Sequence, residues 1–313
     1  MTAVLRVATR ASALATAQSG MVAAELAAAV GRRFELVHVT TVGDVSVESL
    51  AAMGGTGVFV GAVRDAILAG RADIGIHSLK DLPTVPHPSL FLPAIPPRED
   101  PRDALVSRGD LSLARLPHGA VIGTGSPRRA AQLLVFRPDL RIADIRGNVD
   151  TRLGKVASGQ CDATILACAG LARLGLSGVI SEAIEVDVMM PAPGQGALAI
   201  EAATDVPQRD PELFAALSEL DDPHTHACVT AERALLNTLE AGCSAPVGAL
   251  ATISQSGSSR PTMTLNAVAA SVDGQQVFRM STTGFVDEAS ILGSRLAHEL
   301  LAAGAAGLLG ESP

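Results

Sequence analysis

The sequence predicts an α/β protein made of two similar lobes, which two connectors join as a hinge, and a smaller α+β domain at the C-terminal end. Strand and helix patterns alternate from Leu5 to Ile76, and the same alternation begins again after Asp103. After Asp222 the order changes to one helix, three alternating strands and a last helix, which is typical of an α+β domain.

The first lobe begins with a strand and an Ala-rich helix. Ser12 is the expected N-cap of this helix, because a hydroxyl there can accept a backbone N–H that has no partner within the helix. A Gly-, Ser- and Asp-rich segment at 43–57 is a candidate for a mobile loop over a site. The expected strands are residues 5–8, 34–41 and 73–76, and the expected helices are residues 13–30 and 58–69.

The second lobe follows the same plan. Ser126 is the expected N-cap of its first helix, and Pro127 suits the first helical position because its φ angle is already close to the helical value. The turn at 146–150 precedes the next helix. The expected strands are residues 120–122, 140–145 and 163–167, and the expected helices are residues 127–136 and 151–157.

The two lobes read as a diverged internal repeat. Ser12 and Gln18 are six residues apart, as are Ser126 and Gln132. Any two strand–helix–strand units can share such spacing, but here the matches recur in the same order, which favours a repeat with a ligand cleft between the lobes. When Gly70 is set against Gly159, the further matches are Asp73 with Asp162, Ile76 with Ile165, and Leu82 with Leu171.

Two Pro- and Gly-rich connectors, near 97–101 and 191–196, divide the chain. We expect a strand at 197–200 to return to the first lobe. The domains are therefore predicted as residues 1–97 plus 197–221 for the first lobe, 102–190 for the second lobe and 222–313 for the C-terminal domain. The expected elements of that last domain are helices at 225–239 and 287–302 and strands at 247–253, 262–269 and 275–282.

Composition excludes several classes of function. The chain has 313 residues, a net charge of −8 and 48% hydrophobic residues, so it can form real cores but has no general affinity for nucleic acid or an anionic membrane. It has no Trp or Tyr, which disfavours recognition by stacking on bases. No apolar run reaches the length of a membrane span, and the N-terminus lacks a secretory signal. These features predict a cytoplasmic protein with reduced cysteines.

The cysteines and histidines do not predict a metal site. His224, His226 and Cys228 are two residues apart at the start of a predicted helix. Residues i and i+2 of a helix do not share a face, so these side chains are poorly placed to bind one metal ion. Cys161 and Cys168 flank or lie in a buried strand and are expected to pack. Cys243 differs, because it is in a Gly-, Ser- and Pro-rich loop, where its thiol could be a nucleophile, an attachment point or inert.

The stretch from Asp73 to Pro83 is the first candidate for a site. A short aliphatic strand turns polar at its C-terminal end, and ligands of open α/β sheets bind beyond these ends. The polar residues are His77, Ser78, Lys80 and Asp81. A lysine beside an aspartate there indicates either chemistry or an ordinary ion pair in a solvated loop, and these residues alone do not separate the two.

The arginines form the second candidate. Six of them lie in or beside predicted strand-to-helix turns: Arg10, Arg128, Arg129, Arg146, Arg152 and Arg173. Helix N-termini favour anions, and guanidinium groups bind carboxylate or phosphate through two parallel hydrogen bonds. Each arginine could instead pair with a nearby Asp or Glu. Six of them at equivalent turns favour a ligand that carries several negative charges.

Seven motifs then occur in one order along the chain. They are A-T-R-A-S-A-L-A, H-S-L-K-D-L-P, G-T-G-S-P-R-R, I-R-G-N-V-D-T-R-L, L-A-R-L-G-L, P-G-Q-G and A-G-C-S-A-P. On these motifs the chain resembles the porphobilinogen deaminase (hydroxymethylbilane synthase) family over essentially its full length. The resemblance implies two lobes like those of a type II periplasmic binding protein, a hinge and a small α+β domain. It also implies a monomer.

The resemblance implies a reaction as well. Four porphobilinogen molecules are joined head to tail with loss of ammonia to give hydroxymethylbilane in tetrapyrrole (haem) biosynthesis. The chain grows on a dipyrromethane cofactor that a thioether attaches to Cys243. Asp81 matches the catalytic aspartate, which would stabilise the cationic azafulvene formed when ammonia leaves, bind pyrrole N–H groups and move protons.

The other site residues come from the same motifs. The positions that match cofactor contacts are Arg10, Ser12, Ser78, Lys80, Thr124, Ser126, Arg128, Arg129 and Arg152. The positions that match substrate contacts are Arg10, Arg146, Arg152, Arg173 and Gln195. Thr56 and Gly61 stand where some members of the family carry lysines, so no role is transferred to that loop. The alternative is a two-lobed binding protein for a polycarboxylate without turnover, against which the missing export signal and the loop around Cys243 both argue.

Overall fold

The computed structural model describes residues 4–39, 60–241, 245–254 and 260–309. The chain divides into two compact units. Unit 1 comprises Met1–Arg98 and Ala197–His226, and unit 2 comprises Glu99–Gly196 and Ala227–Pro313. The residues predicted as the second lobe and as the C-terminal domain thus fall in one compact unit, and the division into three domains stays a prediction.

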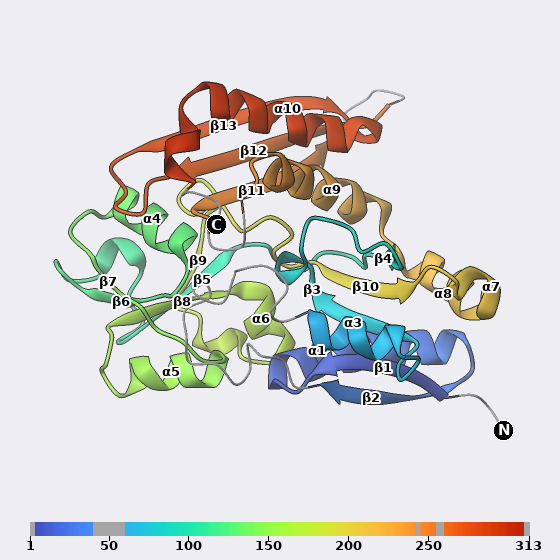
Figure 1. The fold of residues 1–313 in the computed structure, drawn as a ribbon. Coiled ribbons are helices and arrows are strands. Elements are labelled where there is room, and N and C mark those ends of the chain that lie inside the picture. The colour runs from blue at the N-terminus through green and yellow to red at the C-terminus, as the bar shows by residue number, and fades with distance from the viewer. Residues whose placement is uncertain (1–3, 40–59, 242–244, 255–259, 310–313) are drawn as a thin grey trace. The chain divides into compact units, whose positions relative to one another are not determined.

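Unit 1 contains a five-stranded sheet in the order β2-β1-β3-β10-β4. The strands are β1 (Val4–Arg10), β2 (Arg33–Val39), β3 (Ile74–Ser78), β4 (Leu90–Ala94) and β10 (Leu198–Ala203). Strand β1 is parallel to β2 and β3, whereas β10 is antiparallel to β3 and β4. The predicted return of the chain to the first lobe is therefore confirmed, because β10 lies between two strands of that lobe (Figure 1).

Helices cover both faces of this sheet. One apolar core joins the sheet to α1 (Ala13–Ala29) and α8 (Pro211–Leu220), which follows the short helix α7 (Val206–Arg209). A second core joins the other face to α3 (Gly61–Leu68). Sheets that contain parallel strands need this double cover, because apolar side chains point from both of their faces.

Unit 2 contains a second five-stranded sheet in the order β7-β6-β8-β5-β9. Its strands are β5 (Asp103–Ser107), β6 (Val121–Gly123), β7 (Arg141–Ala143), β8 (Ala163–Ala167) and β9 (Glu182–Ile184). Strand β6 is parallel to β7 and β8, and β5 is antiparallel to β8 and β9. Its helices are α4 (Pro127–Phe136), α5 (Val149–Ala157) and α6 (Cys168–Arg173).

The predicted repeat is confirmed in detail. Each sheet has three parallel strands in the same order, followed by a strand that is antiparallel to its neighbour, β10 beside β3 and β5 beside β8. The backbone N–H of Arg6 in β1 donates to Asp73 Oδ2 at 2.8 Å, and the N–H of Val121 in β6 donates to Asp162 Oδ2 at 2.8 Å. Gly70 and Gly159 both adopt positive φ values, 66° and 77°, at the turn before these aspartates.

A separate antiparallel sheet, β11-β12-β13, completes unit 2. Its strands are Val247–Ser254, Thr262–Ala270 and Val277–Phe285, and one core joins β11 and β12 to α9 (Pro223–Thr238) and α10 (Ala289–Ala302). A Cβ atom at Gly293 of α10 would lie 2.2 Å from the Ala231 carbonyl oxygen, so glycine allows α10 to approach α9. The two α/β lobes and the small C-terminal α+β part that the sequence predicts are thus present.

Some elements differ from the expectation. Strand β4, just before the first connector, was not among the expected strands, and it includes Pro93 although proline cannot donate to a ladder. It is tolerated because β4 is the edge strand of its sheet. Strand β7 is shorter than the expected 140–145. Five short turns of 3₁₀ helix complete the described structure: Leu79–Asp81, Leu113–Arg115, Ser177–Val179, Val286–Glu288 and Ala305–Leu308.

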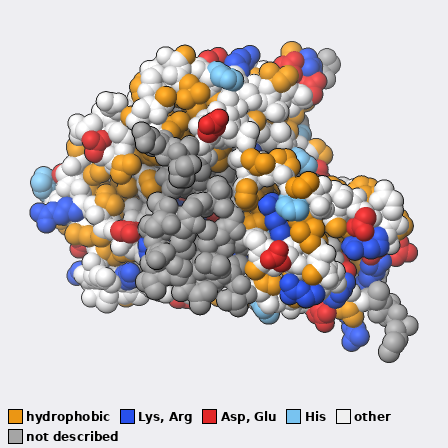
Figure 2. Space-filling model, viewed as in Figure 1, with side chains coloured by type: hydrophobic (Ala, Val, Ile, Leu, Met, Phe, Trp, Pro, Cys, Tyr) orange, Lys and Arg blue, Asp and Glu red, His pale blue; other side chains and the backbone are white. Residues whose placement is uncertain are grey.

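Two surface properties are visible in the described residues. None of their helices has the length and apolarity needed to cross a membrane. On the face shown in Figure 2, acidic and basic side chains are interspersed with hydrophobic ones, as expected for an acidic protein that carries charges of both signs.

Cys161 and Cys168 are buried as expected, and burial raises the pKa of the Cys168 thiol to about 11.

Candidate active site

The C-terminal end of β3 forms one side of a pocket in unit 1. Strand β3 ends at Ser78, and the 3₁₀ turn Leu79–Asp81 follows it directly. The pocket collects residues from β1, α1, the start of α3, β3 and this turn, and they are Arg10, Ala15, Gln18, Val60, Ile76, His77, Ser78 and Asp81. The structure therefore brings Asp81, Ser78 and Arg10 together, as the sequence predicts.

The polar wall of this pocket is ordered by hydrogen bonds. The hydroxyl of Ser78 donates to Oε1 of the buried Gln18 at 3.1 Å. Ser12 caps α1 as predicted, because its hydroxyl accepts the N–H of Ala15 at 3.3 Å. Ser12 and Lys80 are half-buried and are not among the described residues that line the pocket.

A buried charge cluster lies behind the pocket. Glu201 of β10 accepts hydrogen bonds from Nε of Arg64 at 3.0 and 3.1 Å, and Nε2 of His77 lies 3.2 Å from its Oε2. The side chains of His77 and Glu201 are only 5% and 3% exposed. Burial would raise the pKa of Glu201, but its close contacts with His77 and Arg64 outweigh burial and hold this pKa below its usual value.

In unit 2, β6, the counterpart of β1, leads into α4. Ser126 caps this helix as predicted, since its hydroxyl accepts the N–H of Arg129 at 3.5 Å, and Pro127 occupies the first turn. The N–H of Ser126 in turn donates to the hydroxyl of the buried Thr124 at 3.2 Å. Thr124 and Ser126 thus lie together at a helix N-terminus, which favours anions.

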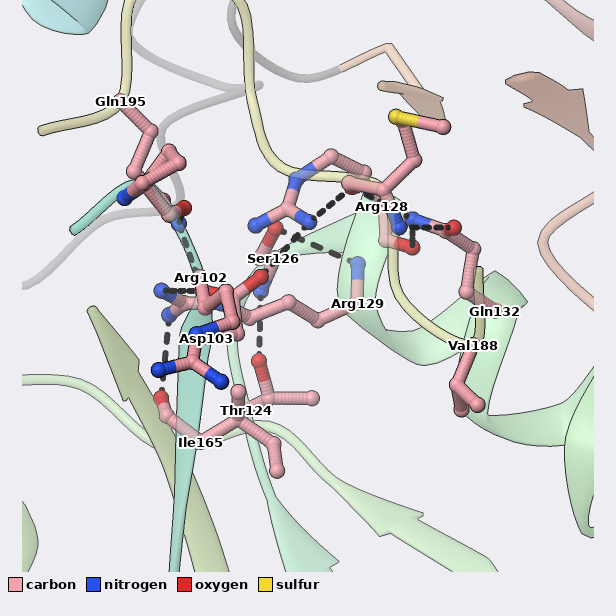
Figure 3. A network of polar contacts seen from close by, with 12 residues as sticks. Arg102, Asp103, Thr124, Ser126, Arg128, Arg129, Gln132, Ile165, Val188 and Gln195 are labelled. Atoms are coloured by element: carbon pink, nitrogen blue, oxygen red, sulfur yellow. Dashed lines mark hydrogen bonds and ion pairs between the residues drawn. The ribbon is translucent and has the colours of Figure 1, made fainter. Parts of the chain in front are cut away.

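Arg128 and Arg129 do not point into solvent but share one buried carboxylate, that of Asp103 (Figure 3). Arg129 donates to Asp103 Oδ1 from Nε at 3.0 Å and from Nη2 at 2.7 Å, and from Nη1 to the carbonyl of Ile165 at 3.0 Å. Nη1 of Arg128 lies 2.8 Å from Asp103 Oδ2 and donates to the Met190 carbonyl at 2.6 Å. For these two arginines, pairing with a nearby Asp is what the structure shows.

The two arginines keep the Asp103 carboxylate charged. Burial alone would raise the pKa of Asp103, but the charges and hydrogen bonds of Arg128 and Arg129 outweigh burial and hold the pKa well below its usual value. Burial lowers the pKa of Arg128, which Asp103 opposes and the charge of Arg129 reinforces. The single negative charge of Asp103 faces the two positive charges of Arg128 and Arg129, so these three buried side chains together carry a net positive charge.

Arg146 and Arg152 add to this positive charge. Burial and the like charges of Arg129 and Arg146 lower the pKa of Arg152 to about 10, against which the charge of Asp144 acts. Arg152 is half-buried and donates from Nε to the Gly147 carbonyl at 2.9 Å, and Arg146 lies 3.6 Å from Asp144. Arginines that depress one another's pKa define a site that an anion would stabilise.

Gln195 and Arg173 donate hydrogen bonds to backbone carbonyls of the two connectors. Gln195 is fully buried and donates from Nε2 to the Pro101 carbonyl at 2.7 Å and to Asp103 Oδ1 at 3.0 Å. Arg173 donates from Nη2 to the Gly196 carbonyl at 2.7 Å, and burial lowers its pKa. Asp103 therefore links the two predicted cofactor arginines to Gln195 of the second connector (Figure 3).

Several residues that the sequence singles out lie outside the described residues or at their edge. Cys243, Thr56 and the candidate loop at 43–57 lie outside the described residues, and Gly61 is the first residue of α3. The predictions about the cofactor attachment and the mobile loop therefore stay predictions. Cys243 follows α9 by a few residues in the chain.

Sequence reasoning missed three residues. Asp103 and Glu201 were not singled out, because their partners come from other strands and helices and no local spacing indicates them. Gln18 appeared only as a match to Gln132 in the repeat. Both glutamines are buried, and Gln132 accepts the Met190 N–H at 2.8 Å and donates to the Met190 carbonyl at 3.0 Å, so the repeat itself was the available signal.

One α/β lobe has a pocket lined by Asp81, and the other gathers arginines around Arg129, side chains that suit a ligand with several negative charges. Sequence comparison identifies the family of this chain. The porphobilinogen deaminase dipyrromethane cofactor binding domain matches residues 5–210, and the porphobilinogen deaminase C-terminal domain matches residues 226–302. The chain belongs to the porphobilinogen deaminase family.

Relatives match over nearly their whole length. Porphobilinogen deaminase 1 of Streptomyces coelicolor is 53% identical over 315 residues, covering 98% of each chain. Porphobilinogen deaminase of Nocardia farcinica is 50% identical over 311 residues, covering 98% of this chain and 88% of the relative. Among solved structures, a periplasmic substrate-binding protein of an ABC transporter from Coxiella burnetii aligns with a TM-score of 0.44 at 15% identity, over 73% of this chain and 96% of that one.

Proposed function

We propose that this chain works as its family does, as a transferase of tetrapyrrole biosynthesis that releases ammonia. It joins four porphobilinogen molecules head to tail to give the linear hydroxymethylbilane. The matched domain is the dipyrromethane cofactor binding domain, and Cys243 is the residue that holds this cofactor through a thioether. When bound, the cofactor supplies the free pyrrole end to which the first substrate molecule is joined.

The observation that carries this proposal is the cluster of arginines that repel one another in unit 2. Arg128 and Arg129 share the one carboxylate of Asp103, and burial together with repulsion from Arg129 and Arg146 lowers the pKa of Arg152. A pyrrole of this pathway carries an acetate and a propionate side chain. Its carboxylates would offset the repulsion between these arginines, so the donor set fits the cofactor and a growing chain of rings.

Two helix starts supply serines that we propose to bind the cofactor. Ser12 and Ser126 begin helices whose N-terminal N–H groups favour carboxylates. Thr124 supports Ser126, and Ser78 lies at the end of β3. The full set is Arg10, Ser12, Ser78, Lys80, Thr124, Ser126, Arg128, Arg129, Arg152 and Cys243.

The residues proposed to bind substrate are Arg10, Arg146, Arg152, Arg173 and Gln195. Two of them hold protein groups in this structure, since Arg173 donates to the Gly196 carbonyl and Gln195 to Asp103. A substrate carboxylate is a stronger acceptor than a carbonyl oxygen, because it carries a full charge. Substrate binding by Arg173 would therefore exchange a connector contact for a ligand contact.

Asp81 is the proposed catalytic residue. When porphobilinogen loses ammonia, the remaining pyrrole is a cation, and a carboxylate held in a pocket stabilises this charge as it develops. Asp81 shares its pocket with Ser78, Arg10 and Gln18, which can orient the pyrrole and its carboxylates. The same carboxylate can accept a hydrogen bond from a pyrrole N–H.

The remaining proposals concern the context of the enzyme. We place it in the cytoplasm as a monomer that acts on a small molecule and binds neither nucleic acid nor membrane, in line with its net charge of −8. The predicted three-domain division, with hinge movement making room for the growing chain, belongs to the same proposal.

One experiment tests the proposed function. Purified protein is mixed with porphobilinogen, and substrate loss, ammonia release and the linear tetrapyrrole are measured together. The proposal predicts one ammonia per porphobilinogen consumed and one tetrapyrrole for every four. A protein that binds porphobilinogen without releasing ammonia would instead be the non-catalytic binding protein.

A further inference from the structure

The segment after β7 places an acidic side chain beside the arginines of unit 2. Strand β7 ends at Ala143, whose carbonyl accepts the N–H of Thr124 at 2.9 Å, so Asp144 is the first residue beyond the end of this strand. Strands β6 and β7 are parallel neighbours, and their carboxyl ends therefore lie at the same edge of the sheet. Ligands of open α/β sheets bind beyond these ends. Asp144 thus lies at the edge of the sheet where a ligand is expected.

Two glycines of the motif G-T-G-S-P-R-R let this segment approach β6 and the loop that begins α4. A Cβ atom at Gly123 would lie 2.5 Å from Cδ1 of the buried Ile145. A Cβ atom at Gly125 would lie 2.9 Å from Asp144 Oδ1 and 3.0 Å from the Ile145 carbonyl oxygen. The Asp144 carboxylate is therefore packed against the backbone of Gly125, in the loop that leads to the helix N-terminus.

The same carboxylate is close to two of the arginines that we propose to bind substrate. Its Oδ2 atom lies 3.6 Å from Nε of Arg146, which is within the range of an ion pair but too long for a hydrogen bond. The charge of Asp144 also opposes the lowering of the pKa of Arg152. The side chain of Asp144 is 63% exposed, so water screens these interactions and they are weak. A carboxylate that makes better hydrogen bonds can therefore take its place.

Asp144 differs in this respect from Asp103. Asp103 is fully buried between Arg128 and Arg129, so its charge holds the lobe together. The ion pair of Asp144 is long and exposed, so it contributes little to the fold. Because like charges repel, Asp144 disfavours the binding of a further carboxylate to the same guanidinium group. Its position therefore affects the affinity for anions more than the stability of the protein.

We propose that Asp144 is a specificity-determining residue, a carboxylate of the protein that competes with substrate carboxylates for Arg146. This inference rests on the proposed function, which places Arg146 among the substrate contacts. The competition weakens the binding of each carboxylate, and it favours release of a product that carries many of them. A ligand with two carboxylates, which can bind Arg146 and Arg152 together, displaces Asp144 more readily than a ligand with one.

The test compares Asp144→Asn with the wild-type holoenzyme at ionic strengths of about 0.01 M and about 0.5 M. Asparagine keeps the size of the side chain but removes its charge. At the lower ionic strength we expect KM for porphobilinogen to fall about two- to fivefold with kcat within about twofold, and we expect the difference in KM to shrink at the higher one. Asp110→Asn is the control. It removes the same charge from the exposed turn after β5 and should leave KM unchanged.

A second substitution tests whether Asp144 acts through Arg146. In the Arg146→Gln enzyme, residue 146 can no longer pair with Asp144, so adding Asp144→Asn should change KM by less than about twofold. A fall in KM of the same size in both backgrounds would overturn the competition for Arg146. A KM that is unchanged or raised by Asp144→Asn alone would overturn the proposal, as would an equal fall in Asp110→Asn.

A second readout does not depend on turnover. Succinate, a dicarboxylate without a pyrrole ring, should raise the melting temperature of Asp144→Asn more than that of wild type, because a ligand stabilises the folded state according to its affinity. Equal rises in the two proteins would overturn the proposal. Wild-type protein that releases no ammonia from porphobilinogen would instead refute the proposed function, and the succinate comparison would still decide the role of Asp144. Intact mass shows that the compared proteins carry the same cofactor.

Discussion

Asp103 and Arg129 form a two-pronged ion pair inside unit 2, in which Nε and Nη2 of Arg129 lie 3.0 and 2.7 Å from one carboxylate oxygen that no solvent reaches. Arg128 and Gln195 meet the same carboxylate. Residues predicted to contact a cofactor are thus held in place by a residue that no motif indicates, and this arrangement gives the first predictions.

Asp103→Asn should lower the free energy of unfolding by about 3–5 kcal/mol, because it leaves two buried guanidinium groups without their counter-charge. Urea unfolding of the two proteins measures this difference. Asp287→Asn is the matched control, since its pair with Arg260 is exposed and solvent screens it, so its loss should change the free energy of unfolding far less. Equal effects of the two substitutions would show that the buried pair does not stabilise the fold.

The stability that Asp103 provides should depend on pH in a defined direction. Its pKa is lowered in the folded state, so its contribution is complete above the pKa of an unfolded aspartate, about 3.9. It is then lost as the pH falls toward the folded-state value. Unfolding free energies of wild type and Asp103→Asn should therefore converge as the pH falls below about 4. A constant difference down to strongly acidic pH would contradict the assignment.

Arg152→Gln should separate binding from stability. Burial and the repulsion from Arg129 and Arg146 disfavour the charge of Arg152 in the protein without ligand, so its removal should leave the melting temperature unchanged or raise it. Loss of one charged hydrogen-bond donor should raise KM for porphobilinogen about tenfold or more. Arg141→Gln, an exposed arginine of β7, serves as control and should change neither quantity. A lower melting temperature with an unchanged KM would make Arg152 a structural residue.

Asp81→Asn should keep the fold and the cofactor but reduce turnover by about 10²–10⁴-fold, because the amide cannot stabilise a cation or take a proton. Single-turnover release of ammonia measures the chemical step directly. The intact mass of the variant serves as its control for cofactor attachment. Near wild-type rates would remove Asp81 from the reaction.

Much of the fold could be predicted from local patterns. The strand 163–167 and the helix 127–136 were predicted with the observed bounds, because Pro127 and the Ser126 cap mark the helix start and a short aliphatic run marks the strand. The repeat also predicted that Asp73 and Asp162 are equivalent, and the structure gives them the same hydrogen bond to the first strand of their sheets.

Other parts could not be predicted because they depend on distant partners. Strand β5 follows a proline-rich connector and is recognisable only by its pairing with β8 and β9. The burial of Arg128 and Arg129 depends on Asp103, which lies about 25 residues earlier in the chain. Local sequence showed that these arginines begin a helix, but not that a carboxylate from another strand neutralises one of them.

Cys243→Ser should give a folded protein without cofactor, because a serine hydroxyl is far less nucleophilic than a thiolate. Its circular dichroism spectrum should match that of wild type, while its mass should equal that of the bare chain. Cys228→Ser, at a buried position of α9, is the matched control and should still carry the cofactor. Full activity of Cys243→Ser would refute the thioether.

The intact mass of the purified wild-type protein, followed by a peptide map, tests the central claim most directly. The account predicts an excess equal to one dipyrromethane on the peptide that contains Cys243, or the appearance of this excess after porphobilinogen is added to a bare chain. A folded protein that keeps the bare mass after incubation with porphobilinogen would contradict the account.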